Sequence, residues 1–360
     1  MPLPMIKDSK KSIKNIIAIA AGKGGVGKST ITVNLALALK KRGFSVGIID
    51  TDVYGPSLKK MLPPEQPPLQ KEQTLFPATC SGIKVISMAY FRKEEEASAV
   101  RAPIANGIVT QFIKNVDWGN LDFLLIDFPP GTGDIQITIC QQAALTGALM
   151  ITTPQEVAIM DVKKAMNLFD QLRVPIIGVI ENMSYYLSNS QPIYLFGKGG
   201  GEKLAREAGV PLLGEVPVDP ILSQSGDQGK SIFNETNFGE TTLTETFFNI
   251  AERVMQSLDV IKESSEKTAL SIKQKDNSTL LIHWNDGSIG EYRFSELQKN
   301  CPCANCVDET TGKRFPNSVR EDVQVRNIQK VGRYALKFEF TSGCSSGIFS
   351  YEMLHLCSKN

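Results

Sequence analysis

The stretch GKGGVGKST, residues 22–30, decides the fold of this chain. It follows an apolar run, Ile16 to Ala20, that is typical of a buried strand, and it precedes an Ala- and Leu-rich segment, Ile31 to Lys40, that is typical of a helix. Strand, glycine loop and helix in this order, with the spacing G-x-x-x-x-G-K-[ST], predict a loop that binds the phosphates of a nucleoside triphosphate. The loop consists of Gly22, Lys23, Gly24, Gly25, Val26, Gly27, Lys28, Ser29 and Thr30.

The residue types in this loop match the chemistry of a phosphate site. Glycines allow positive φ and let backbone N–H groups approach phosphate oxygens, while the following helix adds the positive end of its dipole. We expect Lys28 to neutralise the β- and γ-phosphates and the Ser29 hydroxyl to ligate Mg²⁺. ATP and Mg²⁺ are therefore the expected cofactors.

A second lysine, Lys23, is not required in an ordinary loop of this kind. Alone it would be interpreted as a solvated surface lysine. In the context K-G-G-x-G-K-[ST] it is expected to reach a phosphate in a facing subunit, as an arginine finger does in trans. This interpretation predicts a homodimer.

Acidic residues follow two further buried strands, 46–50 and 121–127. The carboxyl ends of such strands form the ligand-binding edge of an open α/β sheet. Asp52 is expected to orient the attacking water or hold the metal, and Asp127 to hold Mg²⁺ directly or through water. An aspartate at a strand end is more often a cap or turn residue, but the phosphate loop favours the functional interpretation. Residues 129–134, PPGTGD, suit a loop that senses a γ-phosphate.

Strands and helices are expected to alternate up to about residue 258, which indicates an α/β fold with a doubly wound, mostly parallel sheet covered on both faces. Residues 63–79 are interpreted as an exposed insertion. Further strands are expected at 148–152, 175–180 and 212–216, and helices at 157–172, 201–208 and 242–258. The expected domains are a loose N-terminal segment at 1–14, an ATPase domain at 15–259, a linker at 260–269 and a small β-rich, metal-binding domain at 270–358, with a hairpin at 280–294 and a strand at 336–340.

Charge and composition exclude further classes of function. The net charge is +1 and gives no basic excess for nucleic acid, and no apolar stretch approaches the ~20 residues that span a bilayer. Five of the seven cysteines come after residue 300, which is not a secreted disulfide pattern. We therefore expect a cytoplasmic protein that neither binds nucleic acid nor inserts into a membrane. Cys140, in an apolar helical stretch, is expected to be a core residue.

Three cysteines, Cys301, Cys303 and Cys306, lie within six residues. Thiolates at this spacing can converge on one ion, and they select zinc or an iron–sulfur centre. A structural zinc site needs a fourth ligand. The alternative is three unrelated reduced cysteines.

The region from Gly22 to Phe233 resembles the Mrp/ApbC/Nbp35 class of deviant P-loop ATPases, relatives of MinD and ParA. The motifs that carry the resemblance are GKGGVGKS at 22–29, DTDVYGPS at 50–57, WG at 118–119, DFPPGTGD at 127–134, TPQEVA at 153–158 and ENMS at 181–184. The resemblance implies an ATP-dependent homodimer that carries iron–sulfur clusters to apoproteins. It also implies that Lys23 crosses to the partner, that Asp52 and Asp127 serve metal and water, and that Asn182 lies near the adenine.

The chain departs from this family at one place. Many members carry C-x-x-C shortly after the ENMS motif, and two such pairs hold a cluster across the dimer. Here residues 185–191 are YYLSNSQ, and no cysteine occurs between Cys140 and Cys301. The bridging cluster cannot form from these residues.

The C-terminal region resembles the small domain at the N-terminus of gamma-butyrobetaine hydroxylases, through HWNDG at 283–287, the cysteines at 301–306, VGRYAL at 331–336 and GCSSGIFS at 343–350. In the hydroxylases a histidine completes a zinc site where this chain has Cys344. The resemblance thus implies a four-cysteine site, Cys301, Cys303, Cys306 and Cys344, for zinc or iron–sulfur. His283, His355 and Cys357 are the rival ligands.

Three functions remain open at this stage. The first is an ATP-hydrolysing carrier or scaffold for iron–sulfur clusters. The second is a positioning ATPase like MinD or ParA with a structural zinc domain, and the third makes the C-terminal domain a protein-interaction module whose metal serves only its fold. The kind of metal distinguishes the first from the other two.

Overall fold

The computed structural model describes most of the chain. The described residues are 13–52, 57–72, 74–91, 102–189, 191–234, 242–266, 269–285, 287–303, 306–307, 323–331, 335–341 and 347–357. The chain divides into two compact units between Ser257 and Leu258, and each is described by itself. No helix among the described residues is both long enough and apolar enough to cross a membrane.

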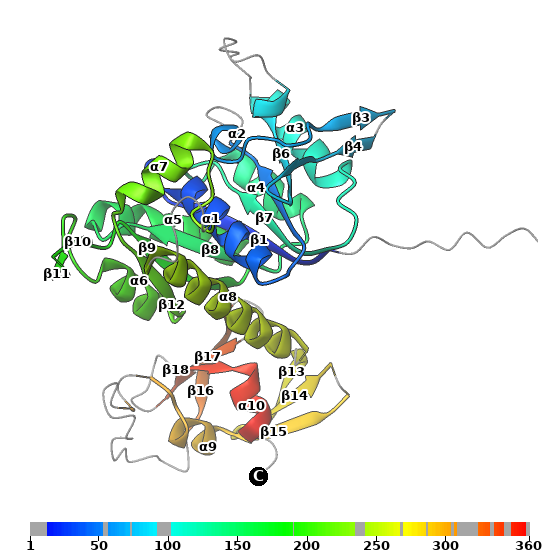
Figure 1. Cartoon of the computed structure of the whole chain (residues 1–360). Helices are drawn as coiled ribbons and strands as arrows, with labels where there is room; N and C mark the ends of the chain where they lie inside the picture. The colour runs from blue at the N-terminus through cyan, green and yellow to red at the C-terminus, as the bar shows by residue number, and fades with distance from the viewer. Residues whose placement is uncertain are drawn as a thin grey trace, which may run out of the picture. The chain divides into compact units, whose positions relative to one another are not determined.

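The first unit is built on an eight-stranded sheet with the order β12-β9-β8-β1-β7-β2-β6-β5 (Figure 1). Its strands pair in parallel except β5, which runs antiparallel to β6. The strands are β1 Ile13–Ala21, β2 Val46–Asp50, β5 Ala78–Cys80, β6 Ile83–Ser87, β7 Leu121–Asp127, β8 Gly147–Thr152, β9 Ile176–Asn182 and β12 Leu212–Val216.

Helices connect these strands, and two small hairpins extend from the unit. The helices are α1 Lys28–Lys41, α2 Leu58–Met61, the 3-10 turn η1 Met88–Tyr90, α3 Ala102–Lys114, α4 Asp134–Gln142, α5 Glu156–Gln171, α6 Gly200–Ala208, α7 Pro220–Gln228 and α8 Thr242–Glu266. The hairpins are β3 Leu69–Lys71 with β4 Thr74–Phe76, and β10 Tyr186–Ser188 with β11 Gln191–Ile193. The predicted α/β class with a mostly parallel sheet is confirmed.

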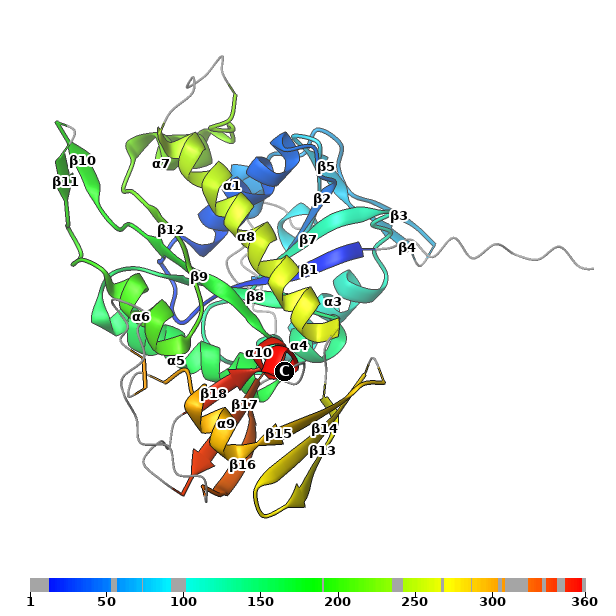
Figure 2. The same cartoon turned by 90° about the horizontal axis from the view of Figure 1, so that it is seen from below.

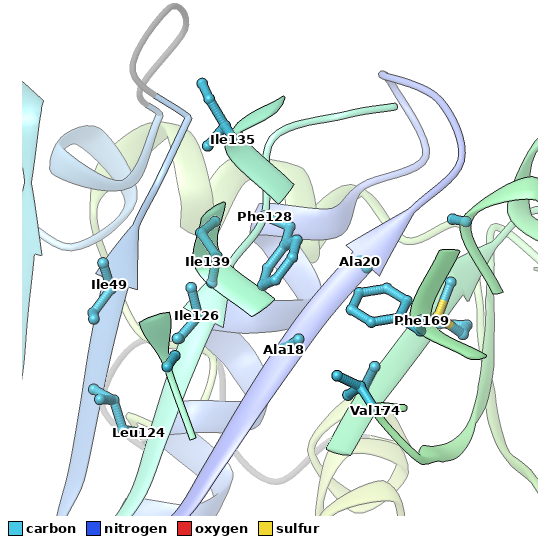
Figure 3. Close-up of a cluster of buried hydrophobic side chains, with 14 of the residues drawn as sticks. Ala18, Ala20, Ile49, Leu124, Ile126, Phe128, Ile135, Ile139, Phe169 and Val174 are labelled. Atoms are coloured by element: carbon cyan, nitrogen blue, oxygen red, sulfur yellow. The ribbon is translucent and has the colours of Figure 1, made fainter. Parts of the chain in front are cut away.

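Burial on both faces explains why the central strands are apolar throughout. In β1, Ala18 and Ala20 face a cluster formed by side chains of α3, α4, α5 and α6, while Ile17 and Ile19 are also fully buried. The small alanines leave room for two aromatic rings, Phe128 and Phe169, whose centroids lie 5.6 Å apart. Figure 3 shows both rings beside the alanines of β1.

Strand register brings the acidic residues to one edge of the sheet. Asp127, the last residue of β7, pairs with Asp50 on β2 and with Ile19 on β1. The loop after β1 then leads directly into α1. The phosphate loop and two buried carboxylates therefore meet at the carboxyl ends of three neighbouring strands, where α/β sheets bind ligands.

Within its described residues, the second unit contains two three-stranded antiparallel sheets and two short helices. Its core includes Trp284, Phe338, Phe349 and Tyr351. The elements are β13 Ala269–Asp276, β14 Thr279–Trp284, β15 Ile289–Arg293, α9 Phe294–Lys299, β16 Val325–Val331, β17 Ala335–Phe340, β18 Gly347–Ser350 and α10 Tyr351–Cys357. The predicted hairpin at 280–294 and the predicted strand at 336–340 are confirmed.

Three details differ from the sequence-based expectations. Residues 63–79 are not simply an exposed insertion, because Leu75 is buried and β5 begins at Ala78 as an edge strand of the main sheet. The helix expected to end at Leu258 continues to Glu266 and so includes most of the segment interpreted as a linker. Strand β1 begins at Ile13, within the segment expected to be loose.

Candidate functional site

Two glycines of the phosphate loop have backbone conformations that other residues rarely adopt. Gly25 and Gly27 have φ values of 83° and 82°. A Cβ atom at Gly27 would also collide with Nδ2 of Asn182. That amide is buried and donates a hydrogen bond to the Val26 carbonyl oxygen at 2.8 Å. Asn182, the last residue of β9, thus fixes the backbone of the phosphate loop through this hydrogen bond.

Asp127 is the centre of the polar network beneath the loop. Its carboxylate is fully buried and forms an ion pair with Lys28, with Nζ 2.7 Å from Oδ1. The Ser29 hydroxyl donates to Oδ2 at 2.7 Å, and the Thr32 hydroxyl donates to Oδ1 at 3.0 Å. All three partners lie on the first turns of α1, so a single carboxylate orients both residues expected to contact phosphate and metal.

A second buried carboxylate, Asp50, lies beside Asp127. Burial and, next to it, the neighbouring Asp127 carboxylate together raise the pKa of Asp50 to about 7, whereas the hydrogen bond from Ser87 opposes the shift. The Ser87 hydroxyl donates to Asp50 at 2.8 Å, and the backbone N–H of Asp52 donates to its other oxygen at 3.1 Å. Asp50 therefore anchors the start of the loop that carries Asp52, the expected water- or metal-binding residue.

Lys23 lies near the start of the phosphate loop, whereas Lys28 lies near its end. It is half-buried, and its Nζ lies 3.5 Å from Oε1 of Gln155, the residue that precedes α5. The neighbouring Gly22 packs against the same helix, because a Cβ atom there would collide with the backbone of Asp161. The loop thus contacts α5 on one side and Asn182 on the other.

The loop fits a phosphate chain with magnesium. Added Cβ atoms at Gly24 and Gly25 would meet no atom within 4 Å, so the backbone faces open space there. Helix α1 has no side-chain cap and no acidic residue in its first turn. Its first N–H groups and its dipole thus attract an anion. The Ser29 hydroxyl with Asp127 behind it offers the oxygen ligands that Mg²⁺ prefers.

Sequence reasoning missed several supporting residues. Thr32 follows Lys28 by four positions, so helical periodicity alone could have placed it on the face that contacts Asp127. Ser87 and Gln155 have no such signal, because they reach the site only through strand order and packing. Asn182, expected near the adenine, donates its side-chain amide to the Val26 carbonyl oxygen of the loop.

Buried Glu181, next to Asn182, fixes the neighbouring loop. It accepts hydrogen bonds from the Ser184 hydroxyl at 2.6 Å and from the backbone N–H of Gly201 at the start of α6. A Cβ atom at Gly201 would lie only 2.8 Å from the Glu181 Cβ. Close packing therefore explains Gly200 and Gly201, and a positive φ of 70° explains Gly199. This helix start is already occupied by the Glu181 carboxylate.

A separate cluster of thiols lies in the second unit. The Sγ atoms of Cys301, Cys303 and Cys306 all lie within 4.8 Å of one another. Cys301 and Cys306 are buried in the core of this unit, and Cys303 is half-buried. Three converging soft donors suit zinc or an iron–sulfur centre. The three thiols thus lie close together, as their spacing in the sequence predicts.

The expected fourth ligand, Cys344, lies outside the described residues. Among the residues that are described, the thiol cluster includes none of the rivals His283, His355 and Cys357. The His355 ring instead packs beside Trp284, with centroids 5.4 Å apart. Cys140 packs against the core of the first unit, and burial raises the pKa of its thiol to about 12.

Comparison with protein families gives two matches that divide the chain as the fold does. A model described as the NUBPL iron-transfer P-loop NTPase, of the ParA group, matches residues 12–255. A second model, the N-terminal domain of gamma-butyrobetaine hydroxylase-like proteins, matches residues 271–355.

Individual relatives are similar over one or both units. The chloroplastic Fe-S cluster assembly factor HCF101 of Arabidopsis thaliana is 36% identical over 95% of this chain and 64% of its own length. The iron-sulfur cluster carrier protein of Aquifex aeolicus is 40% identical over 71% of both chains. The chain spans slightly less than two thirds of the Arabidopsis protein and of the rice protein of the same name, of which it covers 66%.

Solved structures support the same fold. A nucleotide-binding protein from Archaeoglobus fulgidus, determined in complex with ADP, superposes with a TM-score of 0.54 at 34% identity and covers 64% of this chain and 94% of its own. The cell-division ATPase MinD of Pyrococcus furiosus reaches a TM-score of 0.51 at 23% identity over 68% of this chain and 99% of its own, which shows a shared fold.

Proposed function

The chain belongs to the ParA-type P-loop NTPases described as iron-transfer proteins, and from this premise we propose that it is an ATP-hydrolysing carrier of iron–sulfur clusters for apoproteins. The observation that carries the proposal is the Asp127 network, which orients Lys28 and Ser29 beneath an open glycine loop. Relatives named as cluster carriers or assembly factors are 34–43% identical to this chain. Two MinD proteins of Pyrococcus are 22–23% identical and support only the fold.

In nucleotide binding and hydrolysis, each residue of this site has its own role. Backbone N–H groups of residues 24–29 bind the phosphate oxygens, Lys28 neutralises their charge, and Ser29 with Asp127 holds Mg²⁺. Bound Mg²⁺ supplies Lewis-acid polarisation of the γ-phosphate. Asp52 orients the attacking water, and Lys23 acts on the nucleotide of a partner subunit. Because catalysis then depends on that partner, hydrolysis is expected to be slow in the isolated chain.

The cluster is cargo, and we assign it to the second unit. The sequence lacks the central cysteine pair that the resemblance leads one to expect, and among the described residues Cys301, Cys303 and Cys306 are the thiols that converge. Gly347 supports Cys344 as the fourth ligand, because a Cβ atom at Gly347 would lie 2.7 Å from Sγ of Cys301 and only three positions separate Gly347 from Cys344. Thiols grouped for metal and not for disulfides also suit a cytoplasmic protein.

The decisive experiment measures iron, zinc and acid-labile sulfide in full-length protein purified without oxygen, together with its visible absorption spectrum. Cys306→Ser is the test variant, and Cys140→Ser, which removes a thiol from the other unit, is the matched control. We expect iron and sulfide in the wild type and in the control, and their loss from the test variant. One zinc per chain and no iron, even after reconstitution, would contradict the carrier function and leave an ATPase with a structural zinc domain.

A further inference from the structure

The hairpin β10–β11 exposes an unusual amount of apolar surface. It occupies the segment in which the family resemblance places a cysteine pair, and Figures 1 and 2 both show it projecting from the first unit. Six large side chains on the hairpin and just after it are 38–54% exposed. They are Tyr186, Leu187, Ile193, Tyr194, Leu195 and Phe196.

The two faces of the hairpin are both apolar. Tyr186 pairs directly with Ile193, so these side chains share one face, while Leu187 points to the other. An isolated two-stranded hairpin is marginally stable in water unless it packs against something else. A hairpin with exposed apolar residues on both faces therefore requires a partner surface that the single chain does not supply within its described residues.

A second exposed apolar group adjoins the hairpin. Val157 and Met160, three residues apart on the first turns of α5, are 64% and 62% exposed. The chain between β11 and α6 lies against Pro154, two residues before this helix, because a Cβ atom at Gly197 would lie 3.8 Å from the Pro154 Cβ and carbonyl oxygen. We call these two residues and the six hairpin side chains the hairpin patch.

The hairpin patch also borders the phosphate loop. Lys23 Nζ lies 3.5 Å from Gln155 Oε1, two residues before Val157. Any protein that covers the patch would therefore lie beside the lysine that is expected to act on a partner subunit. This position favours a second copy of the chain over an unrelated partner.

Area and charge agree with self-association. The exposed parts of the eight residues amount to an area on the order of 700 Å², near the roughly 800 Å² per partner of a stable interface. Residues 185–196 contain no acidic or basic residue. The border of the patch carries Glu156 and Lys198, one charge of each sign, so two copies related by a twofold axis can meet without like-charge repulsion.

We infer that the hairpin patch is the metal-independent dimer contact of this protein, in which apolar burial joins the two copies at the place where relatives place cysteines. The inference rests on the proposed nucleotide-dependent dimer. It predicts that two hairpins bury each other when ATP is bound, with no iron or sulfide needed at this contact.

The test measures self-association of full-length, iron-free protein by sedimentation velocity, with Mg²⁺ and a non-hydrolysable ATP analogue. Leu195→Asp places like charges in the contact, and Val157→Asp does so from α5, where an acidic residue near a helix start is otherwise favourable. Leu69→Asp is the matched control, because Leu69 is a single exposed leucine on the other hairpin, 51% exposed. Thermal melting verifies that all three variants fold.

We expect the wild type and Leu69→Asp to dimerise alike, and both patch variants to raise the dimer dissociation constant by at least about 30-fold, the effect of losing a hot-spot side chain. The inference is overturned if Leu195→Asp dimerises like the wild type. It is also overturned if the wild type binds the analogue but stays monomeric, which would leave the patch to a different partner. No cluster is present in this measurement. A failure of the proposed cluster transfer would therefore leave the dimer contact intact, and a failure of the dimer contact would leave the proposed cluster transfer intact.

Discussion

At the scale of single residues, Lys28 has two roles, and one substitution removes both of them. Lys28→Ala removes the phosphate contact and also leaves Asp127 buried without its cation, which typically costs about 3–5 kcal/mol. We expect ATP binding to be lost in isothermal titration calorimetry and the free energy of unfolding to fall by about 3 kcal/mol. Lys41→Ala, at the exposed end of the same helix, should change neither quantity. Intact ATP binding by Lys28→Ala would contradict the assignment of the loop.

Two glycines of the same loop should differ sharply in their tolerance of alanine. Gly27→Ala forces a side chain into positive φ and against Asn182, so the nucleotide-free protein should lose about 2–4 kcal/mol of unfolding free energy. Gly24→Ala meets open space and should change stability by less than about 0.5 kcal/mol. Urea unfolding of both variants measures the difference. Equal losses would mean that Asn182 does not support the loop as described.

Much of this site was predictable because its motif combines local structure with chemistry. The glycine loop, Lys28 and Ser29 follow from a short pattern that includes its own strand and helix. The amide of Asn182 under Val26 was not predictable, because 156 residues separate the two partners and only the sheet order brings them together.

At the scale of secondary-structure elements, Asp122 joins β7 to its surroundings. Its carboxylate pairs with Lys14 of β1 at 2.8 Å and accepts hydrogen bonds from the backbone N–H and the hydroxyl of Ser45. The hydrogen bond from Lys14, followed by those from Ser45, lowers the pKa of Asp122 to about 2. The ionised form is thus favoured in the folded state.

Because of this pKa shift, the contribution of Asp122 to the free energy of unfolding depends on pH. Because the folded pKa lies below the unfolded value of about 3.9, the stabilisation is complete above pH 4 and is lost as the pH falls toward 2. Asp122→Asn should therefore be about 1 kcal/mol less stable than the wild type at pH 7, since the group is partly exposed, and the difference should shrink at pH 3. Urea unfolding followed by Trp118 fluorescence measures it. A difference that does not change with pH would contradict this origin.

Elements of the first unit were easier to predict than those of the second. Strand β2 is apolar up to its final Asp50, and β7 is apolar from Phe123 up to its final Asp127, so their type and their ends are both visible in the sequence. Strand β13, ALSIKQKD, and strand β16, VRNIQKV, mix charged and apolar residues and are edge strands of small sheets. Their pairing, and not their own pattern, makes them strands.

At the scale of the whole molecule, the two units should respond separately to metal removal. Cys301 and Cys306 lie in the core of the second unit, so extraction of a bound ion would leave buried thiols without their metal and loosen that core. The chain has two tryptophans, and each unit contains one of them, Trp118 and Trp284, both buried. Each tryptophan can therefore report on one unit.

We expect a chelator to shift the fluorescence of Trp284 to longer wavelength in the Trp118→Phe variant of the full chain. The Trp284→Phe variant, which reports on Trp118, should show no shift and should retain ATP binding. A shift in both variants would mean that the units do not respond independently. No shift in either would mean that the thiol cluster holds no metal that matters for the fold.

The contact between Gly22 and α5 has a thermodynamic consequence. Two stretches of backbone that touch without an intervening side chain cannot move independently, so a displacement of the phosphate loop passes to the helix that carries Val157 and Met160. Reciprocity of coupled equilibria then fixes the relation between ligand and self-association. If the nucleotide strengthens pairing of two copies by a given factor, pairing strengthens retention of the nucleotide by the same factor, so the nucleotide affinity of this protein depends on its own concentration.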